Sequence, residues 1–165
     1  MTSNLFGYVT FQINVENYCL YAMVVQDRRG KGRPVALGFL ATEKAENIKA
    51  FFNAFKRAHT QCNLATYFFV DKDYNEITQI QKAFPKATVL LCVWHVLAFV
   101  RKHMTRHFGA GRAPTSRHFY EAVYHSYSEA DFENNWAKMM DHVPKSQRDY
   151  MVDNWYECRR RWSLA

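Results

Sequence analysis

The spacing of apolar residues in the first quarter of the chain predicts β-strands. Residues 6–15, 19–26 and 34–40 are rich in β-branched and aromatic residues at a period of two. Polar breaks at 16–17 and 27–32 separate these segments. Because the breaks are short, the pattern predicts three antiparallel strands joined as a meander.

The spacing then lengthens to three or four residues, which indicates helices. We expect Thr42 to be the N-cap of a helix that extends to His59, with apolar side chains along one face. A second helix is predicted over 74–84, where Asp73 and Glu76 have the spacing of a capping box.

Two short apolar segments, 65–70 and 88–92, predict buried strands. The resulting order is βββαβαβ, in which a three-stranded meander is extended by two parallel strands through right-handed crossovers. This order is that of the RNase H-like fold, an α/β architecture with a mixed sheet. Beyond Trp94 the pattern predicts only helices, at 95–108, 116–126, 128–142 and 146–162, with a Gly/Pro loop at 109–114.

Length and composition exclude several classes of protein. The 165 residues are enough for one domain, and a hydrophobic share of 48% excludes a disordered chain. The longest apolar runs fall far short of the roughly 20 residues that a membrane span needs. The four cysteines form no CxxC pair, which favours reduced thiols. We therefore expect a soluble intracellular protein without a membrane partner.

The net charge of +7 is concentrated in one part of the chain. No Asp or Glu lies between Ile77 and Tyr120, so the cations there have no acid nearby to pair them. The basic residues of this segment are Lys82, Lys86, Arg101, Lys102, Arg106, Arg112 and Arg117. Such a surface suits a polyanion, because Lys and Arg release counterions from phosphates. The last five residues are the candidates for nucleic-acid binding, and a solvated helix face without a partner is the alternative.

Two carboxylates follow the predicted strand at 65–70. The carboxyl ends of parallel strands are where α/β proteins place their sites. Asp71 and Asp73 are therefore candidate Mg²⁺ ligands for phosphoryl transfer. The alternative is that Asp73 only caps its helix and that Asp71 is a turn residue.

Thiol and imidazole groups gather near the last strand. Cys92 and His95 form a CxxH sequence, and His103 and His107 are four residues apart on the helix that follows. These groups are zinc ligands. The alternative, which the single cysteine favours, is a buried thiol at Cys92 with His95 hydrogen-bonded locally.

The tryptophans recur at helical spacings, so we expect them in the core; base stacking is the alternative. They are Trp94, Trp136, Trp155 and Trp162.

Several strings of residues together resemble the transposase domain of Mutator-like elements (MULE), most closely the domesticated copies in SWIM-type zinc finger proteins. The resemblance covers nearly the whole chain, and no single string is specific by itself. The strings are TFQIN at 10–14, YCLY at 18–21, PVA at 34–36, FVDKD at 69–73, FPKA at 84–87, LLCVWHV at 90–96 and NWYEC at 154–158.

The resemblance implies a DDE transposase core on an RNase H-like fold over residues 1–108, followed by a helical insertion over 109–165 that is truncated. It also implies nuclear DNA as the substrate or partner. Asp71 matches the second catalytic Asp of the family, and Cys92 with His95 matches its CxxH motif. The first catalytic Asp corresponds to Tyr8 in this chain. The third acid and the SWIM zinc finger lie downstream in the family, beyond Ala165.

The leading hypothesis is a transposase-derived RNase H-like domain or fragment that is catalytically inactive and binds DNA or protein, with no resident cofactor. The alternative is an active DNA strand-transfer enzyme whose missing carboxylates, and with them Mg²⁺ or Mn²⁺, belong to a longer natural chain. A third hypothesis is a helical interaction module that does not contact nucleic acid.

Overall fold

The computed structural model describes the backbone of residues 3–10 and 15–164 and the side chains of 15–164. The chain forms two compact units, unit 1 from Met1 to Leu90 and unit 2 from Leu91 to Ala165. The sequence instead divides the chain after residue 108, between a core and an insertion. The predicted division separates the core of the family from its insertion rather than two packed units, and it stays a prediction.

A five-stranded sheet organises unit 1, with the order β3-β2-β1-β4-β5. The strands β1 (Ser3–Thr10), β2 (Cys19–Gln26) and β3 (Gly32–Leu40) are antiparallel neighbours, which confirms the predicted meander. β4 (Ala65–Val70) pairs in parallel with β1, and β5 is Thr88–Leu91. Part of the first predicted strand, residues 11–14, falls outside the described residues.

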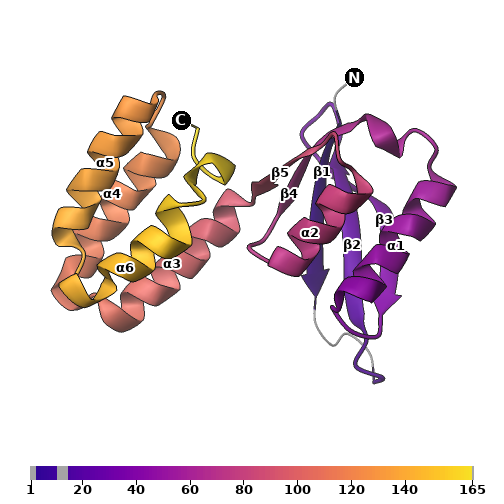
Figure 1. Cartoon of the computed structure of the whole chain (residues 1–165), viewed down its shortest axis with the longest axis horizontal. Helices are drawn as coiled ribbons and strands as arrows, with labels where there is room; N and C mark the ends of the chain where they lie inside the picture. The colour runs from indigo at the N-terminus through magenta and orange to yellow at the C-terminus, as the bar shows by residue number, and fades with distance from the viewer. Residues whose placement is uncertain (1–2, 11–14, 165) are drawn as a thin grey trace. The chain divides into compact units, whose positions relative to one another are not determined.

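Helices α1 (Ala45–Ala58) and α2 (Tyr74–Ala83) cover one face of this sheet (Figure 1). The core beneath them is aromatic. The ring centroids of Tyr21 on β2 and Phe51 on α1 are 4.7 Å apart, and those of Phe68 on β4 and Phe84 are 4.8 Å apart. Burial of these large side chains supplies most of the stabilisation of the layer.

The start of α1 differs from the sequence prediction. Its N-cap is Lys44, not Thr42, and the Lys44 side chain makes no capping hydrogen bond. Thr42 Oγ1 instead accepts a hydrogen bond from the side chain of Asn47 at 2.9 Å. The threonine thus still supports the first turn, but from outside the helix.

From Val93 onward, unit 2 is built of helices joined by short loops over its described residues. Its long helices pack their apolar faces together, with Phe119 of α4 lying 5.2 Å from Trp162 between ring centroids. The elements are α3 (Val93–His107), η2 (Gly109–Gly111), α4 (Arg112–Tyr124), α5 (Glu129–His142), η3 (Lys145–Gln147), α6 (Arg148–Met151), the π-helical turn η4 (Val152–Tyr156) and η5 (Arg159–Arg161).

Two local predictions meet different outcomes in this unit. Ser128 caps α5, as expected, by accepting a hydrogen bond from the N–H of Asp131 at 3.1 Å. The predicted loop at 109–114 is wrong from Arg112 onward, because α4 already begins there. Pro114 falls in the first turn of α4, where its missing N–H costs no helical hydrogen bond.

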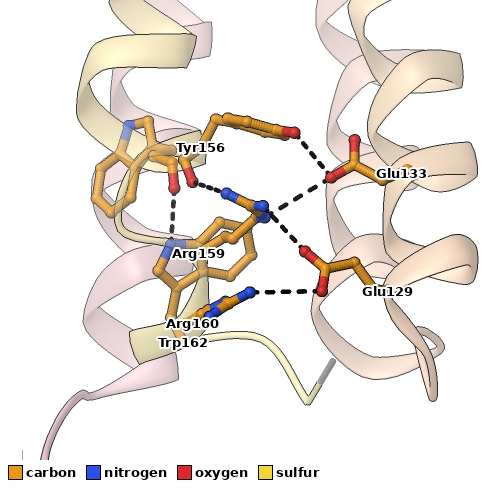
Figure 2. Close-up of polar contacts among 7 residues, drawn as sticks. Glu129, Glu133, Tyr156, Arg159, Arg160 and Trp162 are labelled. Carbon is orange, nitrogen blue, oxygen red and sulfur yellow. Dashed lines mark hydrogen bonds and ion pairs between the residues drawn. The ribbon is translucent and has the colours of Figure 1, made fainter.

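The single helix predicted for 146–162 is also wrong. The chain passes from α6 through the π-helical turn to a 3₁₀ turn. In a continuous α-helix the carbonyl of Trp155 would accept from the N–H of residue 159. Here it accepts from the indole Nε1 of Trp162 at 3.0 Å, which folds the last turn back over the helix (Figure 2).

Arg159 ties this last segment to α5 (Figure 2). Its guanidinium lies 3.0 Å from Oε1 of Glu129 and 3.7 Å from Oε1 of Glu133, and it stacks 4.3 Å from the ring of Tyr156. The Tyr156 hydroxyl donates to the same Glu133 oxygen at 2.7 Å. In the described part of the chain, no helix is both long and apolar enough to cross a membrane.

Candidate functional site

The carboxyl end of β4 carries the two candidate magnesium ligands. Asp71 follows the last strand residue, Val70, and is half-buried. Asp73 is the N-cap of α2, and its Oδ1 accepts hydrogen bonds from the N–H of Asn75 at 2.7 Å and of Glu76 at 3.0 Å. The capping role considered for Asp73 is therefore confirmed, and it occupies one oxygen of this carboxylate.

Glu76 turns its carboxyl group into the core of unit 1. The side chain is 3% exposed, and the hydroxyl of fully buried Tyr21 donates a hydrogen bond to its Oε1. Burial is the main cause that raises the pKa of Glu76 from 4.5 to about 7. The hydrogen bond from Tyr21 lowers this pKa, whereas the charges of Asp71, Asp73 and Glu43 raise it. Burial, and then Glu76, also hold the pKa of Tyr21 well above its usual value.

Sequence reasoning missed the Tyr21–Glu76 pair, although each residue carries a signal of burial. Glu76 lies four residues before Ile80 and so shares its face of α2. Tyr21 lies on the same face of β2 as Cys19 and Met23, each two residues away. The sequence does not show that these two faces meet, because 55 residues separate the partners.

In the resemblance to the transposase family, Tyr8 of β1 occupies the position of the first catalytic Asp. The register between β1 and β4 indicates how this position lies relative to Asp71. Phe6 pairs with Phe69 across the parallel strands. Continuing this register by two residues brings position 8 beside Asp71. Position 8 of β1 would then face the first residue after β4, and this position holds a tyrosine rather than a second carboxylate.

The acids at this edge do not fit a two-metal centre. Mg²⁺ takes six oxygen ligands, and a pair of such ions needs several carboxylates. Among the residues that the structure describes, no group of three or more His, Cys, Asp and Glu is placed to hold a metal ion. Glu76, a further acid close enough to interact with Asp71 and Asp73, is already engaged by Tyr21.

The CxxH residues lie at the start of α3. Cys92 is half-buried and is the N-cap of this helix, but its side chain makes no capping hydrogen bond. Nδ1 of His95 is buried and finds no hydrogen-bond partner among the described residues, so the local bond expected for His95 is not formed at this nitrogen. A structural zinc takes four ligands, of which these residues supply two. The pair by itself does not fit a closed zinc site.

The histidine pair further along α3 is engaged in packing. His103 Nε2 lies 2.9 Å from Oε1 of Gln147, and its ring stacks 3.6 Å from that of Tyr150. Burial lowers the pKa of His103 and so favours its neutral form. These contacts attach α3 to η3 and α6 and give the histidine a structural role.

All five candidate nucleic-acid-binding residues are exposed, and four of them are cations without an ion pair among the described residues. Arg101, Lys102 and Arg106 lie on α3, and Arg112 begins α4. Over the described ranges of the chain, no ion pair joins any of these four to an acid. Their charge is therefore available to an anionic partner.

Arg117 is different from the other four. Its Nε lies 3.2 Å from Oε1 of Glu121, whose other oxygen lies 2.8 Å from Nδ1 of His118. The hydrogen bond from His118, and then that from Arg117, lower the pKa of Glu121. The expectation that no acid lies near Arg117 is wrong, because the acid-free segment ends one residue before Glu121 and a helix brings residues i and i+4 together.

The tryptophans also divide into two groups. Trp136, Trp155 and Trp162 are 2–6% exposed, which confirms the expected core positions. Trp94 is 70% exposed, so the core prediction is wrong for this residue. It lies at one end of an open groove of about 540 Å³ along α3, which Arg101, Lys102 and Arg106 also line.

The fold first defines the class of protein. Unit 1 is an α/β unit with a mixed sheet, and its strands and helices follow one another in the order βββαβαβ. A family model then identifies the relatives. The model described as zinc finger SWIM domain-containing protein 1/3, RNaseH-like domain, matches residues 3–90. The match covers 88 of the 165 residues, more than half, and the chain belongs to this family.

The matched range ends at Leu90, which is also the last residue of unit 1. The predicted RNase H-like fold and the predicted relation to SWIM-type zinc finger proteins are therefore confirmed for unit 1. The groove on α3 lies outside the matched residues.

Proposed function

We propose that this chain is a transposase-derived RNase H-like domain of Mutator-like origin that binds DNA without sequence preference and carries out no strand transfer. The observation that carries the proposal is the exposed face of α3. Arg101, Lys102 and Arg106 have no acidic partner there among the described residues. Cations in this state release counterions when they neutralise phosphates, which drives binding to any sequence. A nuclear location follows from a DNA partner.

The absence of strand transfer is supported by the state of the acids in unit 1. Metal ions that carboxylates position supply several kcal/mol of transition-state stabilisation, so the loss of one carboxylate costs orders of magnitude in rate. Position 8 holds a phenol, Asp73 is engaged in capping α2, and Glu76 is buried against Tyr21. Asp71 is left as the carboxylate that matches the family pattern.

DNA binding is tested by fluorescence anisotropy with a random duplex at several salt concentrations. We expect a dissociation constant of about 10⁻⁴ to 10⁻⁶ M at physiological salt, and a logarithm of affinity that falls with the logarithm of salt by about 0.9 per phosphate neutralised. Replacing Arg101, Lys102 and Arg106 together by Gln should flatten this slope by about 2 to 3. Arg117→Gln is the matched control and should leave the slope unchanged, since Glu121 already pairs Arg117.

An unchanged slope in the triple variant would contradict DNA binding by α3. If, in addition, the affinity for duplex does not change with salt concentration, a helical interaction module that does not contact phosphates is favoured instead.

The second candidate function is strand transfer by a longer natural chain. The parallel pairing of β1 with β4 favours it, because the register at Phe6 and Phe69, continued by two residues, leads from position 8 to Asp71. The reading frame upstream and downstream would then supply the missing acids. For the present chain we expect Mg²⁺ or Mn²⁺ to bind in calorimetry with a millimolar dissociation constant or weaker, about −4 kcal/mol. Tight stoichiometric binding that Asp71→Asn abolishes would favour the enzyme instead.

A further inference from the structure

The groove on α3 combines two features that rarely coincide on a surface without a ligand. Trp94, at its amino end, exposes 70% of its surface, although a buried indole would stabilise the fold. A single exposed aromatic residue is ordinary in itself. This one, however, lines a groove of about 540 Å³ together with three cations.

The sequence of α3 places these side chains along one face of the helix. Trp94, Ala98, Lys102 and Arg106 are spaced by four residues and so lie one above another, and Arg101 lies beside them, three residues after Ala98. From residue 94 to residue 106 the helix rises about 18 Å. That length equals roughly five phosphates of one strand at the 3.4 Å spacing of B-form DNA.

The charge of this face has one sign. α3 contains no Asp or Glu, and no ion pair engages Arg101, Lys102 or Arg106 within the described part of the chain. The indole ring lies edge-on to that of His95, with 4.8 Å between the centroids. The face therefore presents an exposed aromatic plane beside unneutralised cations.

We propose that this groove binds single-stranded nucleic acid, with Trp94 stacking on a base while Arg101, Lys102 and Arg106 hold the phosphates that follow. This proposal rests on the DNA binding proposed above and names the form of the ligand. Charge alone would accept a duplex or an acidic peptide equally well. The indole favours a single strand, because a duplex hides the faces of its bases and an acidic side chain has no aromatic face to stack.

The protein carries its own reporter for this contact. The other three tryptophans are buried, so quenching of tryptophan emission by a ligand reports on Trp94. With the full chain, oligothymidylate should quench this emission more strongly than a duplex at the same phosphate concentration. Trp94→Ala should weaken the binding of oligothymidylate about 5- to 150-fold, the equivalent of one stacked base, and Trp94→Phe should weaken it less.

The salt slope separates stacking from charge. Trp94→Ala removes no cation, so its slope with oligothymidylate and its affinity for duplex should match those of the wild type. Tyr127→Ala is the matched control, since Tyr127 is 75% exposed but does not line the groove. Circular dichroism checks that each variant is folded.

Several results would overturn the proposal. One is an affinity of Trp94→Ala for oligothymidylate equal to that of the wild type, and another is a preference for duplex over single strand. A third is quenching by polyglutamate as strong as that by oligothymidylate, which would point to an acidic peptide. If the Trp94 variants bind oligothymidylate like the wild type but the triple Gln variant has a flatter salt slope, this proposal fails and the proposed binding of duplex DNA by the cations of α3 stands. If the triple Gln variant also keeps its salt slope, both proposals fail.

Discussion

The acids of unit 1 and the cations of unit 2 are both clustered in the sequence, but the fold treats them in opposite ways. At the end of β4, Asp73 is engaged in a helix cap and Glu76 is buried against a tyrosine. On α3, Arg101, Lys102 and Arg106 point their charges to solvent. A metal ion would find few open ligands at the first place, whereas a phosphate would find open donors at the second.

The comparison shows that burial decides whether a cluster of charges can be used. A buried carboxyl group loses its solvation and becomes easier to protonate, so it contributes to the fold rather than to ligand binding. An exposed cation keeps its charge and loses little by exchanging water for a phosphate. Three predictions, taken from the largest expected effect to the smallest, can break or sharpen this contrast.

The largest effect is expected from the pH dependence of unit 1. The pKa of Glu76 is about 7 in the folded chain and 4.5 ordinarily, so the folded state holds the proton more tightly than the unfolded state. Stability is therefore highest below about pH 4.5 with respect to this group and falls as the pH rises through about 7. The loss is about 3 kcal/mol, at 1.36 kcal/mol per pKa unit.

Urea unfolding at several pH values measures this loss, and Glu76→Gln should remove it because the amide does not ionise. Circular dichroism follows the whole chain, while tryptophan fluorescence follows unit 2, where all four tryptophans lie. If the wild type and Glu76→Gln lose stability equally over this pH range, the buried carboxyl group is not the cause.

A smaller effect is expected where unit 2 half-buries one cation and exposes its neighbour. Arg159 contacts two glutamates and has a side chain 22% exposed, whereas Arg160 lies 3.6 Å from Glu129 alone and has a side chain 78% exposed (Figure 2). Arg159→Ala should destabilise unit 2 by about 1 to 2 kcal/mol. Arg160→Ala should change its stability by less than about 0.5 kcal/mol. Urea unfolding followed by tryptophan fluorescence compares the free energies of unfolding of the two variants. Equal losses would show that the contacts of Arg159 with α5 stabilise unit 2 no more than those of Arg160.

The smallest effect concerns the helix cap. Asp73→Ala should cost about 1 kcal/mol, because the N–H groups of Asn75 and Glu76 lose their acceptor. Asp73→Ser keeps an acceptor at the N-cap and should restore most of the loss. Unfolding by circular dichroism measures both variants, and a serine variant as unstable as the alanine one would argue against capping as the role of Asp73.

Local rules predicted much of the fold. The period-two segment at 19–26 coincides with β2, and the caps at Asp73 and Ser128 form as their spacing indicates. These features depend on residues within a few positions of one another, which is why sequence patterns capture them. The predicted helix over 146–162 is wrong because the chain passes from α6 through a π-helical turn to a 3₁₀ turn, where the Trp162 indole donates to the carbonyl of Trp155.

The sequence by itself determined the order of the elements, the acid-free segment and the tyrosine at position 8. Only the tertiary structure decided which of those charges are available. It buried Glu76 beneath Tyr21 and exposed Trp94 beside the cations of α3. The physical reason is that solvation and partnership depend on which faces meet in space, and side chains 55 residues apart can meet only after the sheet and its helices have packed.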